Sequence, residues 1–103
     1  MIELKTKYTP YEEQHNRSKH MDFNHWLFRF PNGYGASVVC HLINERVMTY
    51  GNANQPFDLA VIFFDEDDRY EITYNTPVAN DVIGYLTEKD IEEYLERIEK
   101  LEE

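Results

Sequence analysis

The sequence predicts an α+β fold in which an antiparallel sheet of about four to five strands packs against a C-terminal amphipathic helix. Two hairpin patterns and one helical stripe of apolar residues indicate this fold class. A chain of 103 residues has the length of one domain with one core. Residues 1–103 are therefore expected to form a single domain.

The first hairpin is predicted around a turn motif at residues 31–35. Residues 25–30 are aromatic and apolar, and residues 36–43 form a second apolar run. Between them, Asn32 and Gly33 form a dipeptide that supplies positive φ angles in tight hairpin turns. The two runs are therefore expected to pair as antiparallel strands.

The second hairpin is predicted around the acidic tract 65–68. Residues 57–64 are the most apolar stretch of the chain, which indicates a central strand. In residues 70–74, the side chains of Tyr70, Ile72 and Tyr74 alternate with more polar ones, which predicts one buried and one solvated face. The acidic tract between the two strands is expected to form a charged turn.

Residues 87–102 are predicted to form the C-terminal helix. Thr87 is expected to be its N-cap, with Asp90 at the capping-box position three residues later. Apolar residues recur at spacings of three and four along this segment, and they define a stripe that should lie on the sheet. The stripe consists of Ile91, Tyr94, Leu95, Ile98 and Leu101.

The N-terminal segment, residues 1–24, is expected to be flexible or irregular. Between Tyr8 and Asn24 the chain is polar, contains Pro10 and has few aliphatic residues. A long loop or a short irregular helix is the expected structure there.

The charge is distributed unequally along the chain. The formal net charge is −10; residues 55–103 contain fifteen acidic and four basic residues, whereas residues 1–54 contain five acidic and six basic ones. An anionic half repels the phosphates of nucleic acids and attracts basic partners, although acidity also serves solubility alone. The sequence therefore predicts a basic protein partner and no direct binding to nucleic acid.

The histidines and the cysteine do not form a pattern that predicts catalysis or a metal site. His15, His20 and His25 recur at intervals of five, which places them on no common face, and we expect them to be exposed loop residues. Cys40 and His41 are neighbours on a predicted strand, so they point to opposite faces, and Cys40 is expected in the core. We therefore expect a non-enzymatic protein without a cofactor or a metal.

The residues predicted to contact a partner are acidic side chains and two tyrosines. The acids lie in the charged turn and on the outer helix face, where carboxylates can stand in for phosphates opposite a basic groove; both segments can equally be solvated surface. The tyrosines are each next to a glycine in a predicted loop, where they add contact area at small entropic cost. The candidates are Asp65, Glu66, Asp67, Asp68, Glu92, Glu96, Glu99, Tyr34 and Tyr50.

Three stretches of the chain, residues 31–38, 57–61 and 74–87, resemble a group of small acidic proteins encoded by phages and prophages of Gram-positive bacteria. The resemblance extends from about Trp26 to the C-terminus. Residues 52–54 depart from it, because Asn52, Ala53 and Asn54 stand where that group has paired glycines after Tyr-Gly. The resemblance implies a phage origin but no specific activity.

Together these observations predict an accessory phage protein that binds and inhibits a host nucleic-acid-handling protein, as anti-CRISPR and anti-restriction proteins do. One alternative is a structural or assembly module that forms a homo-oligomer such as a homodimer. Another is a small-molecule-binding protein or an enzyme that uses His41, Asp65 and the loop around Asn52. Because the chain has no apolar signal segment and no run near the roughly 20 apolar residues of a membrane span, we expect it in the cytoplasm of the bacterial host.

Overall fold

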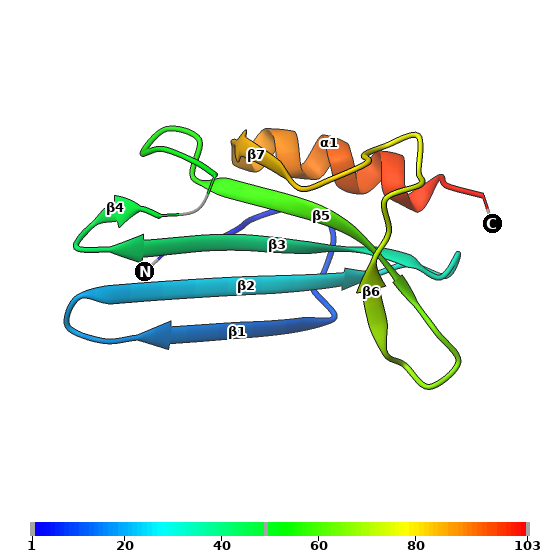
Figure 1. The fold of residues 1–103 in the computed structure, drawn as a ribbon, viewed down its shortest axis with the longest axis horizontal. Coiled ribbons are helices and arrows are strands. Elements are labelled where there is room, and N and C mark those ends of the chain that lie inside the picture. Colours follow the sequence, from blue (N-terminus) through cyan, green and yellow to red (C-terminus); the bar gives the residue numbers. More distant parts are fainter. Residues whose placement is uncertain (1, 49, 103) are drawn as a thin grey trace.

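The computed structural model describes residues 2–48 and 50–102, and it confirms the predicted α+β class (Figure 1). In the described residues, one antiparallel sheet has the order β1-β2-β3-β5-β6, with β4 added to β3 and β7 added to β5. No helix in these residues combines the length and the apolar composition that crossing a membrane requires. The elements are β1 (Glu12–Arg17), β2 (Met21–Arg29), β3 (Tyr34–Ile43), β4 (Arg46–Val47), β5 (Phe57–Phe64), β6 (Tyr70–Ile72), β7 (Ile83–Leu86) and α1 (Glu88–Glu99).

The first predicted hairpin is confirmed as β2 paired with β3, in a register that runs from Met21 opposite Ile43 to Arg29 opposite Gly35. Only Gly33 in its turn has a positive φ, at 88°, so the expectation of a positive φ at Asn32 is wrong. The reason is the loop length. The Phe30 N–H donates a hydrogen bond to the Tyr34 carbonyl oxygen, so residues 31–33 form a three-residue loop in which only the last position takes the left-handed conformation.

The second predicted hairpin is confirmed as β5 paired with β6, and β5 is central because it also pairs with β3 and β7. The expected buried face of the second strand is wrong, because Tyr70, Ile72 and Tyr74 are each at least 40% exposed. Figure 1 shows the reason: the β5–β6 hairpin extends away from α1, beyond the layer that the helix covers. The period-two pattern therefore marks an exposed aromatic strand at the edge of the sheet.

The predicted helix stripe is confirmed as the centre of the core. Ile91, Leu95 and Ile98 are fully buried in a cluster with apolar residues of β2, β3 and β5, while Tyr94 and Leu101 pack partly buried against it. The remaining members of the buried cluster are Trp26, Phe28, Phe30, Ala36, Val38, Cys40, Phe57, Leu59, Val61 and Leu86. One face of the sheet and one stripe of α1 thus form the main core, and Leu27, Ile62 and Phe64 form a separate, smaller buried cluster.

Both ends of α1 are capped by side chains. The Thr87 hydroxyl accepts a hydrogen bond from the Asp90 N–H, and the Asp90 carboxylate accepts one from the Thr87 N–H, which confirms the predicted capping box. The helix ends at Glu99 rather than at residue 102. There the Asn32 amide donates hydrogen bonds to the carbonyls of Ile98 and Leu101, so a side chain replaces the last helical turn.

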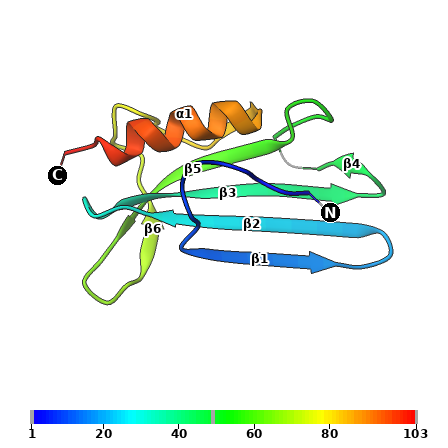
Figure 2. The ribbon, with the colours of Figure 1, turned by 180° about the vertical axis from the view of Figure 1, so that it is seen from behind.

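The expectation that the whole N-terminal segment lacks regular structure is wrong for residues 12–17 and 21–24. β1 forms there because it pairs with the long strand β2 along its full length, although all six of its residues are exposed. Tertiary pairing can impose strand structure on a segment whose own composition does not favour it. Residues before β1 cross the sheet (Figure 2), and Ile2, Leu4 and Tyr8 pack against the core.

Candidate interaction surfaces

The acidic turn between β5 and β6 is organised by Asp65. The Asp65 Oδ1 atom accepts hydrogen bonds from the Asp67 N–H at 2.8 Å and from the Arg69 N–H at 3.0 Å. These backbone hydrogen bonds, that of Arg69 first, together with the charge of Arg69, hold the pKa of the Asp65 carboxyl below its ordinary value. Asp65 is therefore an ionised turn-forming residue as well as a candidate contact.

Basic side chains neutralise part of this turn. Arg69 lies 3.4 Å from the Asp65 carboxylate and 3.0 Å from that of Asp67, and Arg29 of β2 lies 2.8 Å from that of Asp68. Among the described residues, Glu66 is the one acid of the tract without a salt bridge. The turn is thus less anionic than its sequence suggests, and Glu66 is its most available carboxylate.

Aromatic side chains surround a hollow beside this turn. Tyr34 and Phe63 meet edge to face, with ring centroids 4.9 Å apart, and Phe63 remains 38% exposed although it belongs to the most apolar strand. The hollow has a volume of ≈ 550 Å³. We name it the hairpin surface; its lining includes Tyr34, Phe63, Asp65, Arg69, Glu71, Ile72 and Tyr74.

A separate hollow of ≈ 340 Å³ lies at the β1–β2 turn, and the residues that line it include Arg17, Lys19 and Asp22. That second hollow contains none of the predicted contact residues.

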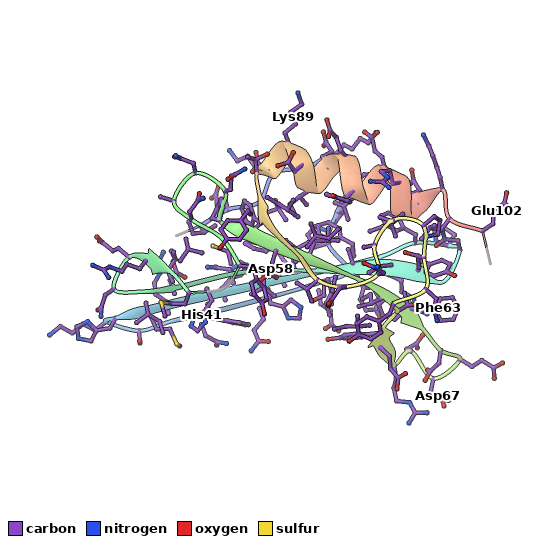
Figure 3. The ribbon with its side chains drawn as sticks, turned by 45° about the horizontal axis from the view of Figure 1, so that its top comes forward. His41, Asp58, Phe63, Asp67, Lys89 and Glu102 are labelled. Carbon is purple, nitrogen blue, oxygen red and sulfur yellow. The ribbon has the colours of Figure 1, made fainter. Side chains whose placement is uncertain are left out.

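The strand register explains why the aromatic side chains meet at the hairpin surface. Tyr34 of β3 lies opposite Phe63 of β5, and Phe63 lies opposite Glu71 of β6. Directly opposed residues of antiparallel strands project from the same face of the sheet. An aromatic pair and a carboxylate therefore form one row across three strands. Figure 3 shows Phe63 and Asp67 of the turn at the same end of the molecule.

The predicted contact acids on the helix bind the chain's own N-terminal segment. A carboxylate oxygen of Glu92 accepts a hydrogen bond from the Lys7 N–H at 2.6 Å, and Glu96 lies 2.8 Å from the Lys7 ammonium. Glu99 accepts a hydrogen bond from the Tyr8 hydroxyl at 3.0 Å. A fourth acid of the same row, Glu88, accepts one from the Lys5 N–H at 2.6 Å. We name Glu88, Glu92, Glu96 and Glu99 the helix acids.

The ionisation of these groups reflects the same contacts. The hydrogen bond to Glu96 raises the pKa of the Lys7 ammonium, and the ammonium in turn lowers the pKa of the Glu96 carboxyl. Burial, followed by the hydrogen bond to Glu99, raises the pKa of the Tyr8 hydroxyl. The helix acids therefore serve first as anchors for residues 5–8, which composition alone did not reveal.

Tyr50 lies apart from the other candidates. It is 64% exposed in the loop before β5, where its carbonyl oxygen accepts a hydrogen bond from the Tyr85 N–H. Figure 1 shows this loop at the opposite end of the molecule from the β5–β6 turn. The structure thus brings together Tyr34 and the acidic turn, but neither Tyr50 nor the helix acids.

The histidines take part in strand contacts rather than in a metal site. His15 and His25 lie in β1 and β2, so the expectation that both are loop residues is wrong, and His20 lies between the strands. A ring nitrogen of His15 lies 2.6 Å from the Asn24 side-chain oxygen, and one of His25 lies 2.7 Å from the Ser37 hydroxyl. In the described part of the chain, no three metal-binding side chains are grouped.

Cys40 and His41 do not form a reactive pair. Cys40 is fully buried, as expected, and burial raises the pKa of its thiol to about 11, so the thiol stays protonated near neutral pH. His41 lies seven residues along β3 from Tyr34, and Figure 3 shows it far from Asp67 of the turn. The arrangement of His41 with Asp65 that a small-molecule site would need is therefore not present.

No protein-family model, curated protein or solved structure matches this chain.

Proposed function

We propose that this chain is a non-catalytic binding protein that captures a basic protein partner at the hairpin surface. The observation that carries the proposal is the row of half-buried Tyr34, exposed Phe63 and exposed Glu71 beside the acidic turn. Exposed aromatic side chains supply contact area, and carboxylates around them select a partner of opposite charge. The sequence signal that could have identified Phe63 is an aromatic residue at the end of an apolar strand.

The charge of the molecule supports a basic partner. Residues 55–103, which form β5, β6, β7 and α1, contain fifteen acidic and four basic residues. A surface of one charge sign accelerates association with an oppositely charged protein and weakens binding to nucleic acid. We propose that the partner itself handles nucleic acid, because carboxylates at the hairpin surface can occupy the place of phosphates in its groove. The resemblance to small acidic phage proteins suggests a bacterial host protein.

A salt-controlled capture experiment tests this proposal. The immobilised chain is incubated with a lysate of a Gram-positive bacterium, retained proteins are identified, and each is purified and tested for direct binding. We expect a basic nucleic-acid-binding protein that is released by 0.5 M NaCl and by excess double-stranded DNA, because both compete with contacts between carboxylates and basic side chains.

Two matched charge variants make the result specific to the surface. The double variant Glu66→Lys and Glu71→Lys reverses one carboxylate of the acidic turn and one of the hairpin surface beside it. The double variant Glu93→Lys and Glu102→Lys changes the net charge by the same amount, but on α1 and just after it. We expect the first to lose the purified partner and the second to retain it. Equal retention by both variants would show that the hairpin surface is not the contact.

Self-association through β1 is the second candidate function. All six residues of β1 are exposed, and the strand forms the outer edge of the sheet. Antiparallel pairing of two such edges centred on His15 places Glu13 opposite Arg17 of a second copy, which gives opposite charges on the same face. Sedimentation should then show a dimer that the variant Arg17→Glu dissociates. A monomer at all concentrations would rule this function out.

A further inference from the structure

Two exposed tyrosines line a third hollow, at the end of the molecule away from the acidic turn. Tyr50 and Tyr85 are 64% and 53% exposed, which makes them among the most exposed large apolar side chains described. Both line a hollow of ≈ 350 Å³ that also includes Asp81, Val82 and Gly84. Figure 1 shows how they meet, since the loop before β5 lies beside β7.

The backbone holds these two tyrosines together. The Tyr85 N–H donates a hydrogen bond to the Tyr50 carbonyl oxygen at 2.7 Å. Gly84 lies so close to Tyr50 that an added Cβ would overlap the Tyr50 Cβ and backbone oxygen. Tyr85 has a φ of 58°, a conformation that bulky residues seldom adopt. The close approach therefore depends on a glycine at position 84.

Two tyrosine rings and a carboxylate suit a cation with an apolar surface. The face of an aromatic ring attracts positive charge, and recognition of alkylated ammonium groups by clustered rings is a known use of this attraction. The Asp81 carboxylate adds a full negative charge at the same hollow. An alkylated ammonium suits this lining better than a primary ammonium, because its methyl groups contact the rings and it needs no hydrogen-bond acceptors.

We propose that Tyr50, Tyr85 and Asp81 form a binding site for an alkylated ammonium group. The site is separate from the hairpin surface, so its test does not depend on the proposed function. Tyr50 lies far from Tyr34 and the acidic turn, so in this proposal it contributes to the ammonium site and not to the hairpin surface. A methylated lysine and a choline-type small molecule share this chemistry.

The test measures binding of tetramethylammonium chloride by NMR, with sodium chloride at equal ionic strength as the reference. We expect a saturable shift of tyrosine ring signals with a Kd on the order of 10 mM. Choline and its uncharged isostere 3,3-dimethylbutanol are compared next, and the isostere should bind about tenfold more weakly. Equal binding of the two would overturn the proposal, because the hollow would then recognise shape alone.

Substitutions in and outside the hollow test where the cation binds. Tyr50→Leu and Tyr85→Asn should each weaken tetramethylammonium binding about fivefold, and asparagine tolerates the positive φ at position 85. Gly84→Ala keeps both rings but should weaken binding by separating them. Tyr70→Leu removes an exposed tyrosine outside the hollow and should leave binding unchanged. Equal losses for Tyr70→Leu and Tyr50→Leu, with folded spectra for both, would contradict the site.

The source of the cation is distinguished by a last comparison. Nα-acetyl-Nε-trimethyllysine amide and choline carry the same head group on different bodies. Tighter binding of the lysine derivative would support the site and identify a methylated protein as its source, whereas tighter binding of choline would support it and identify a small molecule. Failure of both to compete with tetramethylammonium would overturn the proposal.

Discussion

Asn32 joins two parts of the chain that are far apart in sequence. Its side-chain nitrogen lies 2.9 Å from the carbonyl oxygens of both Ile98 and Leu101, and its side-chain oxygen accepts a hydrogen bond from the Tyr34 N–H at 3.0 Å. One amide therefore orders the β2–β3 turn and donates hydrogen bonds to carbonyls at the C-terminal end of α1, where few helical N–H donors remain. Both roles depend on the asparagine amide, because its NH₂ group donates while its oxygen accepts.

The variant Asn32→Ala should lower the free energy of unfolding by about 1–2 kcal/mol, because it removes hydrogen bonds at the end of α1 and in the turn. Urea unfolding followed by circular dichroism measures this change. Asn32→Asp keeps the acceptor for the Tyr34 N–H but loses the donor and places a negative charge at the C-terminal end of the helix. It should be at least as unstable as Asn32→Ala.

The control for this residue is Asn54→Ala, which changes an exposed loop asparagine. It should alter the free energy of unfolding by less than about 0.5 kcal/mol. If Asn32→Asp proved as stable as the unaltered chain, the cap at Ile98 and Leu101 would make no contribution to stability.

At the scale of elements, the helix acids and the N-terminal segment act as one unit. Alternate backbone N–H groups of Lys5 and Lys7 donate to Glu88 and Glu92, four residues apart on α1. The extended segment and the helix therefore match in spacing, since four helical residues and two extended residues both advance about 6–7 Å. Residues 5–8 are held by contacts with α1 as well as by the core.

The contact between Lys7 and Glu96 predicts a pH dependence of stability. The pKa of Glu96 is lowered from 4.5, so the stabilisation is present above that pH and is lost as the pH falls through the lower folded-state value. The pKa of Lys7 is raised from 10.5, so the stabilisation is present below that pH and is lost as the pH rises through the higher folded-state value. The variant Lys7→Met should therefore be less stable between these limits.

Urea unfolding at a series of pH values measures the difference between Lys7→Met and the unaltered chain. We expect it to be constant from about pH 6 to pH 9 and to shrink on both sides. Lys89→Met removes an exposed lysine of α1 that Figure 3 shows pointing away from the sheet, and it serves as the control. A difference that did not vary with pH would show that the Lys7 side chain acts through packing alone.

Elements whose signals are local could be predicted from the sequence. The capping box at Thr87 and Asp90, the stripe of α1 and the apolar run of β5 lie within single segments, so each was visible without knowledge of the fold. β1 was not visible, because its exposed polar residues form a strand only through pairing with β2. The short strand β7, likewise, depends on its pairing with β5.

The candidate sites were less predictable, because they depend on contacts between distant residues. The sequence identified Tyr34 and Asp65 separately, but only the register of β3 with β5 brings them to one hollow. It also identified Glu92 and Glu96 as surface acids, while their contacts with Lys7 join residues more than 80 positions apart. Composition predicts the charge of such residues but not what neutralises it.

At the scale of the whole molecule, charge repulsion and local ion pairs oppose each other. The net charge of −10 disfavours the compact state, whereas exposed ion pairs such as Lys7 with Glu96 stabilise it only weakly. Salt screens both effects. Acidic residues outnumber basic ones twenty to ten, so repulsion has the greater number of contributing pairs.

Sodium chloride should therefore stabilise the chain against urea, by about 1 kcal/mol between 20 mM and 0.5 M. The double variant Glu93→Lys with Glu102→Lys changes the net charge from −10 to −6. It should gain less stability from salt, because less repulsion remains to be screened. A loss of stability with added salt would show that the ion pairs outweigh the repulsion. With the expected result, release of a partner at 0.5 M NaCl reports a broken contact and not an unfolded chain, because the same salt strengthens the fold.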